Sequence, residues 1–326
     1  MRKGRLDAAA AFGILLAAGG VVALVYLLRP GAAPEPLANL SNDACIQCHA
    51  DVAAEWTASH HALAYVNPEV LKLSNDFANQ ECIACHAPRP VLAFAPGERV
   101  LARQSDRQSG VNCLSCHQSA DGGVATANPR PSSSAPCQPR FESRLASVDQ
   151  CAACHNQHKT VDQWRAAPAE RRGENCLGCH MSEVWRAGGR KGRHHAFPAS
   201  HDLAALQSAV TFRAGWSESG PWIELENSGA AHNFPTDERS RAADVQVRWR
   251  QADGAWSAWE NLYRFREPYR DETSLVNTQL PAAQTWRASP APPDGAIAAE
   301  ARLLYRTNPY LPDEAAQEVA RQSLQP

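Results

Sequence analysis

The stretch "CIQCH" at residues 45–49 is the first of five copies of Cys-x-x-Cys-His in this chain. The same frame returns as "CIACH" (82–86), "CLSCH" (113–117), "CAACH" (151–155) and "CLGCH" (176–180). Together the copies use ten of the eleven cysteines. A given residue type follows a cysteine pair by chance in about one motif in twenty. Five histidines in five motifs therefore indicate that the chemistry of the site requires the histidine.

Several chemistries use cysteine pairs at this spacing. A thioredoxin-like redox site normally occurs once per domain. A zinc site uses two pairs, and neither it nor a disulfide framework fixes the residue after the second cysteine. Covalent haem attachment needs two thiols for the two vinyl groups and a histidine for the iron. The pattern therefore predicts five covalently bound c-type haems.

The prediction assigns one role to each cysteine and histidine of the motifs. The haem-attaching cysteines are Cys45, Cys48, Cys82, Cys85, Cys113, Cys116, Cys151, Cys154, Cys176 and Cys179. The proximal iron ligands are His49, His86, His117, His155 and His180.

The sixth iron ligand is expected to be a second histidine. The only methionines are Met1 and Met181, and Met181 directly follows a proximal histidine, which is the wrong geometry for the opposite face of the same haem. Seven of the twelve histidines lie outside the motifs: His60, His61, His158, His194, His195, His201 and His232. Seven histidines for five irons leave at least two to spare. Bis-histidine, low-spin haems are therefore predicted, although the count does not show that every iron has a sixth ligand.

Two pairs of adjacent histidines leave the choice of the distal iron ligand open. Neighbours on a helix point about 100° apart, so His60 or His61 is expected to serve one iron, and His194 or His195 another. His158 and His201 are further ligand candidates. His232 lies in the β-rich part of the chain, where the alternatives are an ordinary loop residue or a ligand that reaches back to a haem and ties the two parts together.

Composition limits the class of protein. A chain of 326 residues suggests about two domains. The net charge of −2 gives no electrostatic support for nucleic-acid binding. Eleven cysteines are typical of an oxidising compartment.

The N-terminus predicts export. Basic residues in "MRKGRLD" precede an uncharged run of 21 residues, 8–28, which is long enough to span a bilayer. The basic end is expected in the cytoplasm and the rest outside. The alternative is a cleaved signal peptide, whose apolar region is usually about 7–15 residues. We expect an uncleaved anchor on the periplasmic side of the inner membrane; a cleaved chain would be periplasmic or extracellular.

The chain divides by composition into four parts. Residues 1–29 form the anchor or signal segment, and 30–41 a Pro/Ala linker. Residues 42–204 have short helical pieces and few apolar runs, which predicts a mainly α or irregular domain whose core is supplied by closely packed haems. Residues 205–326 contain short β-rich stretches in which Val245, Val247 and Trp249 alternate with polar residues. This pattern predicts an all-β, immunoglobulin-like sandwich.

Several motifs resemble a known family. "CIQCHADVAAEWTASHHA" is similar to the opening of periplasmic multihaem cytochromes related to the tetrahaem cytochrome c-554, in which W-x-x-S-x-H-A follows the motif. "HHAFPASHD" and "AHNFPTDERSR" resemble later segments of relatives that carry a C-terminal β-domain, with Asp237 where a glycine is usual. The resemblance implies electron transfer, and it favours His61, His195 and His201 as distal ligands.

The expected function is therefore electron transfer between a membrane donor and a periplasmic or outer acceptor. Expected partners are redox proteins: a quinol-oxidising complex, or periplasmic cytochromes and reductases. No catalytic residue is assigned. One alternative is a reductase of nitrogen or sulfur oxyanions with one five-coordinate haem, and another is a subunit of an extracellular haem filament. Cys137, the eleventh cysteine, is expected to be a buried or modified thiol; a haem ligand or an intermolecular disulfide is the alternative.

Overall fold

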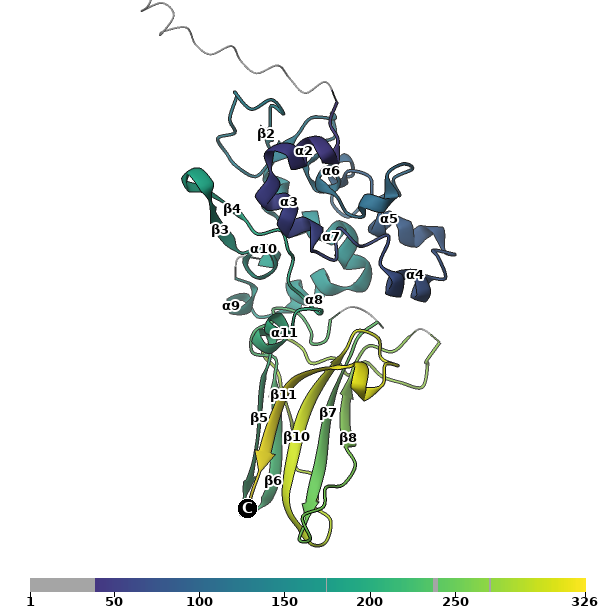
Figure 1. Ribbon diagram of the computed structural model, residues 1–326, viewed down its shortest axis with the longest axis vertical. Coiled ribbons are helices and arrows are strands. Elements are labelled where there is room, and N and C mark those ends of the chain that lie inside the picture. The colour runs from purple at the N-terminus through teal and green to yellow at the C-terminus, as the bar shows by residue number, and fades with distance from the viewer. Residues whose placement is uncertain (1–38, 174, 237–239, 270) are drawn as a thin grey trace, which may run out of the picture.

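The computed structural model describes residues 39–173, 175–236, 240–269 and 271–326. The predicted anchor, residues 8–28, and most of the linker lie outside this part of the chain. Within the described ranges, no helix is both long and apolar enough to cross a membrane. Figure 1 shows a helical part at one end of the molecule and a β-rich part at the other.

The helical part consists of short helices joined by long loops. The α-helices are α2 (Asn42–Cys48), α3 (Ala50–Thr57), α4 (Pro68–Ser74), α5 (Ile83–His86), α6 (Cys113–His117), α7 (Val148–His155), α8 (Thr160–Ala166), α9 (Ala169–Arg172), α10 (Asn175–His180) and α11 (Leu203–Ala209). Single 3₁₀ turns are η1 (Gln80–Cys82), η2 (Val91–Ala93), η3 (Arg107–Ser109), η4 (Ser143–Ala146), η5 (Asn156–His158) and η6 (Ala187–Gly189).

Side-chain caps define where several of these helices begin. The side chains of Ser41, Asn67 and Asp202 accept hydrogen bonds from the first turns of α2, α4 and α11. Asn112 and Ser115 form a reciprocal capping box at the start of α6. Helices this short are marginal without tertiary contacts, so these caps and the packing around them hold the motif helices in place.

Two small strand pairs interrupt the helical part. β1 (Ala125–Thr126) pairs with β2 (Arg140–Phe141), and β3 (Glu183–Arg186) pairs with β4 (Arg190–Arg193) in an antiparallel hairpin. The β3–β4 hairpin follows directly after α10 and projects from the helical part (Figure 1).

The β-rich part contains two antiparallel sheets. Its strands are β5 (Thr211–Ser217), β6 (Gly220–Glu226), β7 (Ala242–Gln251), β8 (Glu260–Phe265), β9 (Thr285–Ala288), β10 (Ala296–Arg306) and β11 (Gln317–Leu324), and the turn η7 (Asp313–Ala315) precedes the last. One sheet has the order β5-β6-β9 and the other β11-β10-β7-β8. The predicted β-rich region with short strands is thus confirmed.

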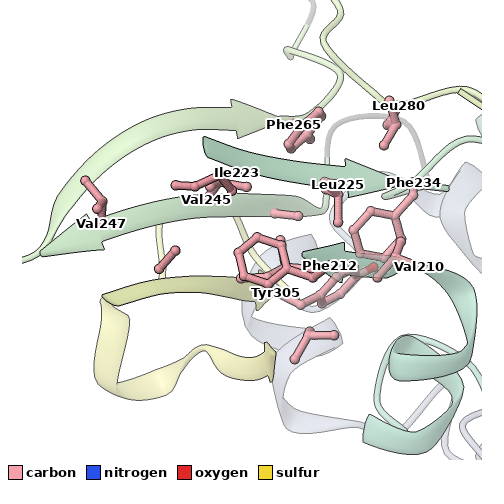
Figure 2. Packing of buried hydrophobic residues seen from close by; sticks show 14 of the residues in the cluster. Val210, Phe212, Ile223, Leu225, Phe234, Val245, Val247, Phe265, Leu280 and Tyr305 are labelled. Carbon is pink, nitrogen blue, oxygen red and sulfur yellow. The ribbon is translucent and has the colours of Figure 1, made fainter. Parts of the chain in front are cut away.

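Both sheets contribute to one hydrophobic core. Phe212, Ile223 and Leu225 of the smaller sheet belong to the same buried cluster as Val245 and Val247 of the larger. Figure 2 shows these side chains between the strands, with Phe234 and Leu280 at one end of the cluster. The alternation expected around Val245 is found: the apolar residues of the pattern lie on the inner face of the strand, in this core. Gln246 on the other face is also buried, because this face carries a network of charged and polar side chains.

The helix α11 lies at the junction of the two parts. It spans the boundary expected at residues 204/205, and its Leu206 packs in the core of the sandwich. Direct contacts also join the parts: Lys159 pairs with Glu267 at 3.0 Å, and the Gln163 side-chain amide donates to the Gln279 side chain at 3.0 Å.

Candidate haem-binding site

Each Cys-x-x-Cys-His motif lies on a short helical segment. The motif cysteines lie in α2, in η1 and α5, in α6, at the end of α7 and in α10, and each histidine ends its segment or follows it directly. Residues three apart on a helix lie on one face, so the two thiols of each motif project together. All eleven cysteines are free. The motifs therefore present paired thiols and form no disulfide framework.

Three proximal histidines face a histidine from a distant part of the chain. The ring centres of His61 and His155 are 6.0 Å apart, with planes inclined by 61°. His117 and His195 are separated by 6.3 Å at 33°. Two imidazoles on opposite sides of one metal ion, each bonded at about 2.0–2.1 Å, have ring centres roughly 6 Å apart. These pairs are spaced to hold one metal ion between them.

The third pair joins the two parts of the molecule. The rings of His180, which ends α10, and His232, in the loop after β6, are 6.3 Å apart and nearly parallel, at 13°. The sequence suggested that His232 reaches back to the helical part, and the structure places it there. Asn233 beside it hydrogen-bonds Gln163 of α8 and Gln279, so the loop is fixed at the interface.

Hydrogen bonds determine which ring nitrogen of these histidines carries the proton. Nδ1 of His117 and His180 donates to the carbonyls of Ala125 (3.0 Å) and Pro198 (2.8 Å). Nδ1 of His195 donates to the Arg193 carbonyl at 2.8 Å. A carbonyl only accepts, so each Nδ1 carries the proton and each Nε2 keeps the lone pair that binds a metal. The same contact occurs at His86, whose Nδ1 donates to Ala64 at 2.7 Å, and at His232, whose Nδ1 donates to Asn233 at 3.0 Å.

Burial keeps the expected distal ligands neutral. Burial, with a smaller contribution from neighbouring histidines, lowers the pKa of His61 to about 3. It also lowers the pKa of His195 and of His232 to about 4, against a smaller upward effect of their hydrogen bonds to backbone carbonyls. Neutral imidazole is the form that ligates iron, so the environment suits that role.

The remaining non-motif histidines occupy other settings. His201 stacks on His60, with ring centres 3.7 Å apart and planes inclined by 22°. His194 Nε2 lies 3.7 Å from a carboxylate oxygen of Glu55. His158 ends η5 and lies near Cys85: the hydrogen bond with Cys154 and, to a smaller extent, the charge of His158 lower the pKa of the Cys85 thiol. The roles of His158 and His201 stay predictions.

The motifs adjoin one another through their cysteines. The side chains of Cys45 and Cys113 are in hydrogen-bond contact, as are those of Cys85 and Cys154. Cys151 contacts Cys176 in the same way. The first motif therefore lies beside the third, the second beside the fourth and the fourth beside the fifth.

The helical part has a limited apolar core of its own. Two small buried clusters occur in its described residues, one around Phe77 and Ile83 and one around Val91 and Val100. By contrast, the sandwich has eighteen residues in a single cluster. Flat apolar groups carried by the motifs would supply the missing buried surface, so the residues present fit covalently attached porphyrins.

Sequence reasoning missed two charged residues of the site. Glu55 of α3 and Arg186 of β3 form a partly buried ion pair beside His195, with an N–O distance of 2.8 Å. The hydrogen bonds from Arg186 lower the pKa of Glu55, against a smaller opposite effect of burial. They lie 131 positions apart, and no local pattern joins them. Cys137 lies near Cys45 and Cys48, and burial raises the pKa of its thiol.

Comparisons with known proteins support haem attachment at the motifs. Residues 44–118 match the family model "Cytochrome c554 and c-prime", and residues 145–184 match the "Doubled CXXCH motif" model. The chain is a multihaem c-type cytochrome. This cytochrome is similar in fold to the crystal structure of a penta-heme cytochrome c552 from Thermochromatium tepidum, with a TM-score of 0.65 and 18% identity over 89% of this chain and 99% of that one. No curated protein shows significant similarity to it.

Proposed function

We propose that this cytochrome carries five c-type haems and transfers electrons between redox partners without catalysing a reaction of its own. The three opposed histidine pairs, with ring centres 6.0–6.3 Å apart, carry the proposal. Two axial histidines leave an iron no open position for a substrate. Haem thus supplies the redox centre, and the protein supplies the two axial ligands and the surroundings that hold them.

The ligand assignment follows the opposed pairs. His155 is paired with His61, His117 with His195, and His180 with His232. His158 and His201 are the predicted distal ligands of the irons held by His49 and His86. The five motif histidines are the proximal ligands, and the ten motif cysteines form the thioether bonds.

The contacts between motifs suggest a connected array of haems. The first motif adjoins the third, and the fourth adjoins both the second and the fifth. The hydrogen bond with Cys85, burial, and the charges of Cys85, Cys116 and Cys151 raise the pKa of Cys154. Because Cys116 belongs to the third motif, the third and fourth motifs are also neighbours. We infer a continuous path for electrons through the haems of the first, third, fourth and fifth motifs. The haem of the second motif branches from this path at the fourth.

Intact mass and optical spectra of the purified protein test this function. Five covalent haems and a low-spin spectrum in both redox states are expected. Each haem should be oxidised and reduced by small mediators without binding carbon monoxide. A stable high-spin haem that binds carbon monoxide in the unmodified protein would contradict the relay and favour a reductase of nitrogen or sulfur oxyanions. Fewer than five haems would mean that one motif is not a haem site.

The proposal includes an anchor on the periplasmic side of the inner membrane. Its motivation is the uncharged run 8–28, which lies outside the described residues. Membrane attachment would hold the haems near a quinol-oxidising complex and leave them accessible to periplasmic cytochromes or reductases. Mass analysis of the membrane-extracted protein should find residues 8–28 still attached. A released protein that begins near Ala32 would indicate a cleaved signal peptide and would favour a periplasmic protein or a filament subunit.

We also infer that the β-rich part is of immunoglobulin-like type. The first, second and fifth strands of the β-rich part form one sheet, and the third, sixth and seventh lie side by side in the other, in the order seventh, sixth, third. This order corresponds to strands A, B and E opposite C, F and G, with the fourth strand added beside C. An experimental structure that placed β8 beside β9 in the smaller sheet would change this assignment to the constant-type arrangement.

A further inference from the structure

The ion pair between Glu55 and Arg186 bridges two elements of the helical part. Oε1 and Oε2 of Glu55 accept hydrogen bonds from Nη1 and Nη2 of Arg186 at 2.9 and 2.8 Å. The two side chains are 17% and 11% exposed, respectively. This bidentate geometry is the strong form of the interaction. It joins α3, just after the first motif, to the β3–β4 hairpin, just after the fifth.

The same two side chains surround the backbone that presents His195. Oε2 of Glu55 also accepts from the backbone N–H of His195 at 2.9 Å. Nη2 of Arg186 also donates to the carbonyl of Arg193 at 2.8 Å. That carbonyl accepts from Nδ1 of the His195 ring at 2.8 Å. Five hydrogen bonds therefore connect the Glu55 carboxylate, the Arg186 guanidinium, the Arg193 carbonyl, and the backbone N–H and ring of His195.

This network fixes three properties of the His195 ring. The bond to the backbone N–H sets the position of the residue, and the Arg193 carbonyl sets the tautomer. The guanidinium holds that carbonyl, so it also sets the orientation of the ring. With Nδ1 occupied, Nε2 is the ring nitrogen left to bind a metal, and the ring centre of His117 lies 6.3 Å from that of His195. Supporting contacts of this kind orient a metal ligand and tune its basicity.

We propose that Glu55 and Arg186 are positioning residues for His195 and hold it as the distal ligand of the haem on the third motif. The inference rests on the proposed function, in which His117 and His195 bind one iron. A second consequence is that the hairpin and α3 are locked together at this haem. Neither Glu55 nor Arg186 touches the iron; both act through the histidine.

Comparison with another ion pair separates this role from a structural one. Glu300 of β10 is also 17% exposed, and it accepts from Nε and Nη2 of Arg248 at 2.9 and 2.6 Å. That pair joins neighbouring strands of the sandwich and contacts no histidine backbone in any hydrogen bond of the described residues. The Glu300→Ala variant therefore loses a similar ion pair without affecting a haem ligand.

The experiment compares Glu55→Ala, Glu55→Gln, His195→Ala and Glu300→Ala in the full-length haem protein. Intact mass first establishes that each variant carries the haem number of the parent. Optical and electron paramagnetic resonance spectra then measure high-spin haem, and carbon monoxide titration counts open irons. Glu55→Gln serves as the second variant if Glu55→Ala does not mature, because the amide oxygen still accepts from the His195 N–H.

The expected result is specific to one haem. In Glu55→Ala, the high-spin fraction of that haem should rise roughly tenfold or more, since hydrogen bonds to a charged group are lost. Glu55→Gln should stay mostly low-spin, with one haem shifted to higher potential because a negative charge has gone. Glu55→Ala combined with His195→Ala should open no more irons than His195→Ala alone. Glu300→Ala should leave the spectra unchanged.

The variants distinguish a failure of the positioning role from a failure of the proposed function. If His195→Ala opens one iron while both Glu55 variants keep the parent spectrum and potentials, the positioning role is wrong and the proposed function stands. If His195→Ala itself changes nothing, His195 is not a ligand, and that part of the proposed function fails together with the inference.

Discussion

His180 and His232 face each other with ring centres 6.3 Å apart and planes inclined by only 13°, although they belong to different parts of the fold. The first ends α10 in the helical part, and the second lies in a loop of the sandwich. An iron bound between them would be a covalent cross-link between the two parts. The sandwich would then donate a ligand to a haem of the helical part.

Replacing His232 with alanine should therefore open one iron and only one. We expect a high-spin signal and binding of one carbon monoxide per chain, because no other imidazole faces His180 among the described residues. Limited proteolysis near residues 203–210 should also accelerate, since the junction loses an iron–imidazole bond. Glu300→Ala is the control, because Glu300 lies in the sandwich and pairs with Arg248 away from the haem ligands. A fully low-spin His232→Ala protein would show that His232 is an ordinary loop residue.

A glycine controls the position of His61. Gly110 has a φ of +56°, and a Cβ placed on it would lie 2.5 Å from the carbonyl oxygen of His61. The neighbouring Val111 N–H donates to that same oxygen at 2.9 Å. Gly110→Ala should push this backbone away and loosen the His61 ring from its position opposite His155, so that a high-spin signal appears at one haem.

Gly122→Ala is the control for this effect. Gly122 also has a positive φ, +86°, but a Cβ there would meet nothing within 4 Å. Both variants suffer the backbone strain of a side chain in this region, whereas only Gly110→Ala contacts the ligand segment. Equal spectra of the two variants would show that steric contact with His61 is unimportant.

The motifs could be predicted from the sequence because their chemistry is local. Two thiols and a histidine within five residues define a haem site whatever the surrounding fold. The period-two pattern around Val245 likewise predicts a strand, since alternation depends only on neighbouring residues. A role for His232 as an iron ligand could be predicted by counting histidines, because the expected irons outnumber the unambiguous distal ligands of the helical part.

The supporting contacts could not be predicted in this way. Glu55 and Arg186 meet only after α3 and the β3–β4 hairpin have packed, and nothing in either local sequence marks the partner. The stacking of His201 on His60 is also a tertiary contact. Gln246 is a polar member of the alternating pattern, yet it is buried and accepts a hydrogen bond from Arg302. Long-range polar pairing decides these positions.

The charged face of the larger sheet contributes to the stability of the sandwich. Asp244 of β7 is buried and accepts from Arg264 and Arg306, each at 2.7 Å. The Arg306 side chain is only 3% exposed. Removing one partner of a buried pair leaves an uncompensated charge, which costs about 3–5 kcal/mol.

Asp244→Ala should therefore lower the free energy of unfolding of the sandwich by about 3–5 kcal/mol. Denaturant unfolding followed by far-ultraviolet circular dichroism measures it. Asp294→Ala, an exposed acidic residue in the loop before β10, should change the stability by less than about 0.5 kcal/mol. If Asp244→Ala unfolds at the same denaturant concentration as Asp294→Ala, the buried network is not a stabilising element.

Asp313 should make the sandwich sensitive to acid below pH 4. Burial alone would raise its pKa, but hydrogen bonds from Arg306 and Gln246 and the charges of Arg306 and Arg302 lower it overall. A carboxyl whose pKa is lower in the folded protein binds fewer protons there than in the unfolded chain. Its stabilising contribution is therefore present above the ordinary aspartate pKa of about 3.9, and it is lost as the pH falls through the lower folded value.

Asp313→Asn should remove this contribution, so the variant should be less stable than the parent at pH 6, and the difference should shrink towards pH 3. Denaturant midpoints measured between pH 3 and pH 6 test this, with Asp294→Asn as the exposed control. A difference that stays constant over this range would mean that the carboxylate charge of Asp313 does not contribute.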